Sequence, residues 1–288
     1  MADQAHAGRL PLRTIEPRRA GIRERLAEAG RHYRLIPFFG RRFVERMYLR
    51  TWLGWLWIPL RPVLDVAARL FVFGGLFGAA SEGVPYVLYL LIGMSAWELF
   101  ERTTYWSTRS LEVNRRFVRR IYVPRLTILA AAIFPSGVSY LVYLGIAFVA
   151  FAGYLIADGH LYLYFGLDTL AAPAGMALLM LLGLSLGCWL SIYGAQARDI
   201  RFWLSYVLSF WFFVTPIVLP LSEIPSGFRE IVQLNPVTAP VLMVKHGLLG
   251  TAGVPLMSLV SMTLFLVIVG GVGLWFFSRS EDAAVEQL

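Results

Sequence analysis

Residues 126–157, LTILAAAIFPSGVSYLVYLGIAFVAFAGYLIA, form one apolar run that contains no charged side chain. A helix needs roughly 20 apolar residues to cross the hydrocarbon core of a bilayer, so this run predicts a transmembrane helix. Five further apolar runs are long enough for a span if they tilt, and they lie at about 63–80, 84–100, 169–197, 202–221 and 254–277. The sequence therefore predicts an all-α polytopic membrane protein with six transmembrane helices.

The composition supports a membrane protein and excludes an ordinary soluble domain. Of the 288 residues, 58% are hydrophobic and 15% are charged, with a mean hydropathy of +0.63. Globular domains carry about 25% charged residues. The net charge of +8 is compatible either with nucleic-acid binding or with basic cytoplasmic loops, and the placement of the charges decides between them.

Arginine and lysine are distributed unevenly between the two sides of the predicted membrane. Of 26 basic residues, 23 lie on the side of the termini, two lie on the other side, and Arg69 lies within the first span. Cytoplasmic loops collect basic residues, so both termini are predicted to be cytoplasmic, and the charge indicates topology rather than nucleic-acid binding. The basic side comprises 1–62, 101–125, 198–201 and 278–288, and the other side 81–83, 158–168 and 222–253.

Two segments flank or interrupt the spans. In residues 36–51, IPFFGRRFVERMYLRT, an apolar stripe through Ile36, Phe39, Phe43 and Met47 predicts an amphipathic helix in the membrane interface. Residues 22–33 repeat this pattern more weakly, and either a helix or a frayed tail fits them. No cleavable signal peptide is visible, so 1–35 is expected to be a cytoplasmic tail and 36–288 a single transmembrane domain.

Residues 222–249, SEIPSGFREIVQLNPVTAPVLMVKHGLL, are half apolar and are broken by Pro225, Pro236 and Pro240. Irregular backbone at membrane depth needs protein or water to satisfy it, so two short re-entrant helices are expected on the external side. A seventh full span is the alternative.

Two acid–base pairs lie inside the spans. Asp65 and Arg69, and likewise Glu98 and Arg102, are four residues apart with the acid first, which places each pair on one helix face. Such charges are costly in a bilayer, so structural pairs near the cytoplasmic face are favoured over a proton relay. Glu101 falls near the same level.

Catalytic and metal-binding patterns are missing from the sequence. The four histidines are scattered, Cys188 is a single cysteine within an apolar run, and no nucleophile or zinc motif occurs. A Walker A loop needs a lysine after Gly-x-x-x-x-Gly, but the sole lysine, Lys245, follows Pro-Val-Leu-Met-Val. We expect no cofactor or metal in this chain, and any ATP and Mg to be bound by a partner.

Three segments resemble the permeases of type-2 ABC exporters for O-antigen, teichoic acid and capsule. They are YLRTWLGWLWIPLRP at 48–62, RDIRFWLSYVLSFWFFVTPIVLP at 198–220, and Leu234-Asn235-Pro236. Their order and spacing match the family from about residue 36 to the end of the chain, although Val237-Thr238-Ala239 departs from its pattern. The residues matched in the external region are Pro216, Pro220, Asn235 and Pro236.

The resemblance implies a homodimer that binds two copies of a cytoplasmic ATPase and moves a lipid-linked glycan outward through the inner membrane. The loop 112–124 is then expected to dock on the ATPase, unless its arginines only enforce topology. The residues expected at this contact are Arg115, Arg116, Phe117, Val118, Arg119, Arg120, Ile121, Arg198 and Asp199.

Aromatic side chains at helical spacing suggest a surface on which sugar rings could stack, with lipid-facing packing as the alternative. A gate at the lipid headgroups is expected from the amphipathic helix. Two alternative functions are a permease for drugs or lipids from the same superfamily and a membrane-embedded glycosyl or lipid transferase. The path candidates are Trp189, Tyr193, Phe202, Tyr206, Phe210 and Phe213, and the gate candidates are Phe39, Phe43, Arg46, Met47 and Arg50.

Overall fold

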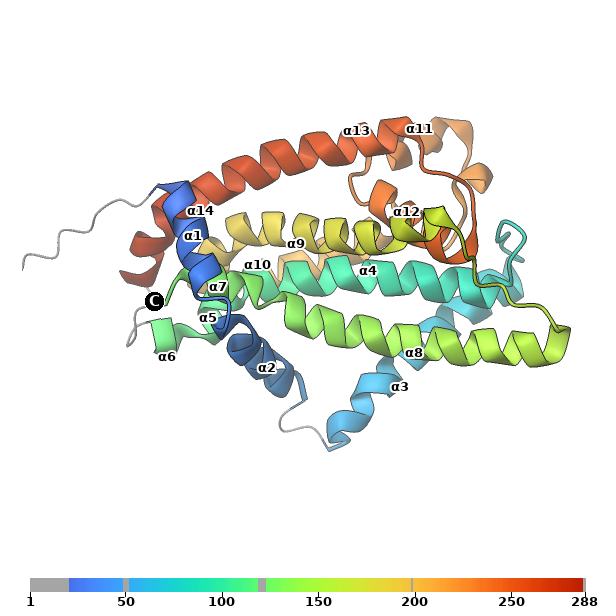
Figure 1. The fold of residues 1–288 in the computed structure, drawn as a ribbon, viewed down its shortest axis with the longest axis horizontal. Coiled ribbons are helices and arrows are strands. Elements are labelled where there is room, and N and C mark those ends of the chain that lie inside the picture. Colours follow the sequence, from blue (N-terminus) through green and yellow to red (C-terminus); the bar gives the residue numbers. More distant parts are fainter. Residues whose placement is uncertain (1–20, 49–51, 119–122, 198, 287–288) are drawn as a thin grey trace, which may run out of the picture.

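A computed structural model describes residues 21–48, 52–118, 123–197 and 199–286. Throughout these ranges the regular elements are helices, as predicted (Figure 1). Two π-helical segments continue the numbered helices, Leu70–Leu76 after α3 and Leu266–Gly270 between α13 and α14. The helices are α1 (Ile22–Arg31), α2 (Leu35–Tyr48), α3 (Trp57–Arg69), α4 (Tyr86–Thr108), α5 (Ser110–Val113), α6 (Arg115–Val118), α7 (Arg125–Ala130), α8 (Ile133–Asp158), α9 (Ala171–Gln196), α10 (Asp199–Phe213), α11 (Ser226–Leu234), α12 (Thr238–Leu249), α13 (Leu256–Phe265) and α14 (Gly271–Glu286).

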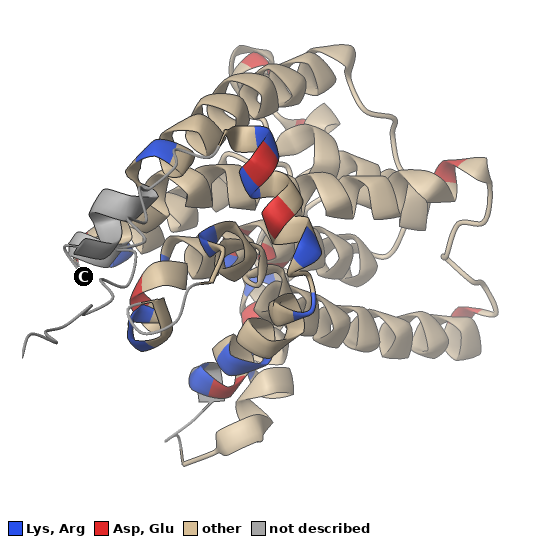
Figure 2. Ribbon diagram, turned by 60° about the vertical axis from the view of Figure 1, so that its left-hand side comes forward, with Lys and Arg blue, Asp and Glu red and all other residues tan. Residues whose placement is uncertain are grey.

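The long helices run side by side and define two ends of a bundle. We call the end that carries α1, α6 and the last turns of α14 the terminal end; the loops before α4 and α9 lie at the opposite end with α11 and α12 (Figure 1). Arginine residues gather at the terminal end (Figure 2). The charge asymmetry of the sequence thus appears as an asymmetry of the folded bundle.

Each predicted apolar run contains a helix. Within the described residues, the three segments that are long and apolar enough to cross a membrane are Arg125–Asp158, Leu167–Gly194 and Leu256–Ser280. The helices of the other three runs, α3, α4 and α10, are shorter or carry more charge. Six spans therefore stay a prediction.

Helices α8 and α13 present apolar side chains outward. Val149 and Ile156 of α8 are 74% and 86% exposed, and Leu264 next to the second π-helical segment is 54% exposed. Contiguous apolar surface of this kind would be unfavourable in water, at about 25 cal/mol per Å². These faces suit contact with lipid tails.

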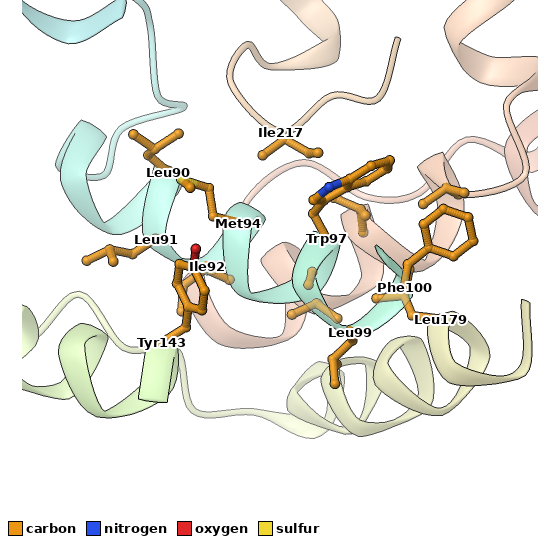
Figure 3. Close-up of a cluster of buried hydrophobic side chains, with 14 of the residues drawn as sticks. Leu90, Leu91, Ile92, Met94, Trp97, Leu99, Phe100, Tyr143, Leu179 and Ile217 are labelled. Carbon is orange, nitrogen blue, oxygen red and sulfur yellow. The ribbon is translucent and has the colours of Figure 1, made fainter. Parts of the chain in front are cut away.

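Helix α4 forms the centre of the bundle. Every residue from Leu88 to Phe100 is buried, and apart from Ser95 and Glu98 the side chains are apolar or aromatic, so this helix is surrounded by protein. Leu90, Leu99 and Phe100 are fully buried. Tyr143 of α8, Leu179 of α9 and Ile217 after α10 belong to the same cluster, as Figure 3 shows.

Small residues let α9 approach α4 closely. Gly183, Gly187 and Gly194 of α9 face the hydroxyl-bearing residues Thr103, Ser107 and Thr108 of α4. A Cβ atom placed on Gly187 would lie 2.1 Å from Ser107 Oγ and 2.3 Å from Ser107 Cβ. The Cβ atom of Ser107 cannot rotate away, so Gly187 has no room for any larger residue.

The variant Gly187→Ala should therefore be destabilised. Overpacking a tight contact costs about 1–3 kcal/mol, so the thermal unfolding midpoint of the detergent-purified protein should fall. Gly145→Ala on α8 is the matched control, because nothing lies within 4 Å of its added Cβ. Equal midpoints for the two variants would show that the α4–α9 contact is not tight.

The apolar stripe of α2 packs against protein. Phe39 and Phe43 are buried, in one cluster with Trp106, Val113 and Ile128. The predicted amphipathic helix is thus formed, and the central residues of its stripe contact protein. The periodicity is correct, but it cannot say what the apolar face touches. Helix α1 is formed, and its Ala29 packs against the cluster that α5, α7, α9 and α14 share.

Helix α10 ends earlier than its apolar run. The run extends to about residue 221, but α10 stops at Phe213 and the chain turns through Thr215-Pro216-Ile217. The residue before a proline avoids the helical region, which explains the break. Beyond it, two short helices, α11 and α12, occupy the proline-broken segment as predicted. Neither is long enough for the alternative of a seventh span.

A charged cavity near the terminal end

A cavity of about 550 Å³ lies among α2, α3, α4, α8 and α10. A smaller cavity of about 190 Å³ shares Arg61, Glu98, Glu101 and Tyr143 with it. The charges of α3 and α4 were predictable from the sequence, but the cavity was not, because α2, α8 and α10 complete it from distant parts of the chain. Its lining includes Arg46, Trp57, Arg61, Glu98, Glu101, Arg102, Tyr105, Arg109, Ser139, Tyr143 and Ser205.

Both predicted acid–base pairs are formed. Glu98 Oε1 lies 2.5 Å from Arg102 Nε, and these side chains are only 11% and 14% exposed. Asp65 Oδ1 lies 3.8 Å from Arg69 Nη1 and is more exposed. The buried pair is the costly one to disrupt, since removing one partner strands a charge away from water.

The cavity combines positive charge with aromatic walls. Four arginines and two glutamates line it, so its formal charge is positive. Within it, Glu98 neutralises Arg102, and Trp97 Nε1 donates to Glu101 at 2.8 Å. Guanidinium groups hold phosphate oxygens through paired hydrogen bonds, and aromatic faces accept apolar ring faces. The lining therefore suits an anionic group that carries a sugar or a hydroxyl-rich ring.

The expected ATPase-docking residues that the structure describes lie at the terminal end. Arg115 and Arg116 of α6 are exposed. Phe117 instead packs on α2: its ring centroid is 6.2 Å from that of Phe39, and Arg42 lies 4.1 Å above its ring. Phe117 therefore packs on α2, and its part in docking stays a prediction. Asp199 begins α10, whereas Arg119, Arg120, Ile121 and Arg198 lie outside the described residues.

The arginines of α2 and α6 lie close enough together to form one basic surface. The pKa of the Arg42 guanidinium is lowered, mainly by burial and then by repulsion from Arg46 and Arg116. Arg46 also lines the cavity, so the same helix joins the cavity to the outer surface of the terminal end. Of the other gate candidates, the Met47 side chain and Arg50 lie outside the described part of the chain.

The six aromatic path candidates form two groups. Trp189 and Tyr193 stack on Phe276 of α14, with centroids 5.2 and 5.9 Å apart. The α10 residues form an exposed stripe instead, between 66% and 78% accessible, and comprise Phe202, Tyr206, Phe210 and Phe213. The expected path along these residues stays a prediction. Phe213 lines the smaller cavity and so connects the stripe to it.

Asn235 ties the Leu-Asn-Pro turn to the end of α10. Its Nδ2 donates to Val214 O (3.2 Å) and Thr215 Oγ1 (2.9 Å), and its Oδ1 accepts from Trp211 Nε1 (2.8 Å). The side chain is buried. Asn235 thus replaces hydrogen-bond partners that the backbone loses where α10 breaks. Pro236 lies between α11 and α12, and Pro220 precedes a short 3₁₀ turn.

Lys245 is a structural residue that the sequence analysis missed. It is fully buried, and its Nζ donates to Pro216 O at 2.8 Å and Ile217 O at 2.9 Å. The same atom lies 3.5 Å from the ring centroid of Tyr89 on α4. A single lysine within an apolar segment was the available signal, since a buried amine needs acceptors.

Comparison with known proteins identifies the class. Residues 41–249 match the family model described as ABC-2 type transporter, and the chain belongs to this family of transporter membrane proteins.

Among individual relatives, the chain is 22% identical over 251 residues to the O-antigen export system permease protein RfbA of Myxococcus xanthus, covering 84% of this chain and 91% of the relative. It is 23% identical over 233 residues to the polysialic acid transport protein KpsM of Escherichia coli, covering 80% and 87%. An O-antigen export permease of Klebsiella pneumoniae is 22% identical over 255 residues, covering 84% and 90%. The family resemblance expected from the three short segments is confirmed.

Proposed function

We propose that this chain is the transmembrane subunit of an ATP-driven exporter that carries a lipid-linked polysaccharide across the cytoplasmic membrane. The observation that carries this proposal is the cavity near the terminal end, where arginines suited to a diphosphate lie beside aromatic walls suited to sugars. The relatives named for O-antigen and polysialic acid transport support the same substrate class.

The proposed arrangement places both termini in the cytoplasm and pairs two copies of this chain with two copies of a cytoplasmic ATPase. ATP and Mg are bound by that partner. Because the terminal end is the basic end, the cavity then opens near the inner leaflet, where a polyprenyl-diphosphate carrier would present its charged group. The exposed aromatic stripe of α10 would line the route of the glycan, and α2 would form a gate beside it.

The charge-reversed double variant Arg115→Glu/Arg116→Glu should lose the ATPase. Both side chains are exposed on α6, so the fold should be kept while the electrostatic attraction to the partner becomes repulsion. We expect at least a tenfold drop in the ATPase that copurifies with the chain. Arg23→Glu/Arg31→Glu on α1 makes the same charge change at the same end and is the control. Normal copurification of the α6 variant would remove α6 from the interface.

Depleting the chain in its native host tests the substrate. We expect polysaccharide attached to its lipid carrier to accumulate inside the cell while the surface loses it. Unchanged surface polysaccharide, with a defect in drug efflux or phospholipid distribution instead, would refute the glycan assignment and favour another substrate of the same superfamily.

A further inference from the structure

One carboxylate joins two segments at the terminal end that are far apart in sequence. Glu112 of α5 places Oε2 3.2 Å from Arg109 Nε and Oε1 3.3 Å from Arg201 Nη1. Arg201 belongs to the first turn of α10. The three side chains are between 20% and 30% exposed, so water screens their attraction less than that of a surface pair.

On one side of this link is α5, which is firmly held. Leu111 and Val113 are buried, and Leu111 packs in one cluster with Cys188 and Ile192 of α9. The exposed arginines of α6 follow directly after α5. A bound partner that displaces α6 would therefore also displace Glu112, which lies one or two helical turns away in α5.

On the other side is α10, whose first turn has little packing. Phe202 and Trp203 are 67% and 58% exposed, and the first buried apolar residue of the helix is Leu204. Arg201 Nε is buried and donates to no group in the part of the chain that the structure describes. The Arg201 guanidinium is thus held by its ion pair with Glu112, and this pair attaches the start of α10 to α5.

We infer that Glu112 is a positioning residue that transmits movement of the α5–α6 segment to α10. This inference rests on the proposed function, in which α6 meets the ATPase. Ser205 lines the larger cavity, and Ser209 and Phe213 line the smaller one, all on α10. A shift of the first turn of α10 would therefore reshape both cavities when the ATPase changes state.

The test uses the full complex with its ATPase in lipid vesicles and compares Glu112→Gln, Arg201→Met and the double variant with wild type. Arg201→Met separates the α10 link from the Arg109 contact, which it leaves intact. Glu230→Gln on the exposed face of α11 removes a carboxylate at the opposite end and is the control. Two quantities are measured: polysaccharide moved per ATP hydrolysed, and ATP-dependent hydrogen exchange of residues 199–206.

Each single variant should lower polysaccharide export per ATP at least tenfold, with ATP hydrolysis within twofold of wild type. The double variant should be no worse than either single one, because both break the same link. The ATP-dependent exchange change at 199–206 should disappear in all three. If that change persists in Glu112→Gln and Arg201→Met, the inference is overturned. If wild type shows the change but moves no polysaccharide, the proposed substrate fails and the link stands.

Discussion

Replacing Lys245 by methionine should strongly destabilise the protein. Methionine has a similar length but cannot donate hydrogen bonds, so Pro216 O and Ile217 O would lose their partner. A buried acceptor left unsatisfied costs about 1–3 kcal/mol, so two of them cost about 2–6 kcal/mol. Thermal unfolding of the detergent-purified chain would measure this loss.

Arg229→Met supplies the matched control. Arg229 also donates to backbone carbonyls, Ser222 O at 2.8 Å and Ile224 O at 3.0 Å, but one of these contacts is exposed and water can replace the donor. Its effect should stay below about 1 kcal/mol. Similar unfolding midpoints for the two variants would mean that Lys245 does not hold the end of α10.

Replacing Glu98 by glutamine should reduce both stability and export. Its partner Arg102 would remain nearly buried without its carboxylate, and breaking such a pair costs about 3–5 kcal/mol. Since both residues line the cavity, export should fall at least tenfold. The measurements are the unfolding midpoint and polysaccharide export in cells that lack the wild-type chain.

Two further variants separate charge from packing at this pair. Glu98→Gln/Arg102→Met removes both charges and should recover at least half of the lost stability, but not export, because the cavity remains altered. Asp65→Asn disrupts the more exposed pair and should cost less than about 1 kcal/mol. A double variant as unstable as the single one would show that the ion pair is not what stabilises this site.

Local features of the fold were predictable from the sequence. A bilayer imposes length and hydropathy on each span, so the apolar runs coincide with helices to within a few residues at most ends. The Glu98–Arg102 pair was equally accessible, because residues four apart share a helix face. The two short helices of the proline-broken segment were predictable as well, because Pro225 and Pro236 interrupt the apolar sequence.

Long-range contacts were not predictable. The early end of α10 depends on Lys245 and Asn235, which lie more than 15 residues further along the chain. The stripe of α2 revealed an apolar face but not that Phe39 and Phe43 pack on protein. The cavity needs five helices, and the link from Glu112 to Arg201 joins two helices that are far apart in sequence, which periodicity cannot bring together.

The most direct test of the account is transport by the purified chain together with its ATPase in inside-out lipid vesicles. Labelled lipid-linked polysaccharide is supplied on the outer leaflet, which corresponds to the cytoplasmic side. We expect ATP to move the polysaccharide into the vesicle lumen, where added glycosidase cannot reach it, and we expect Glu98→Gln to stop this movement. Polysaccharide that stays accessible to glycosidase while the wild-type complex hydrolyses ATP would contradict this expectation.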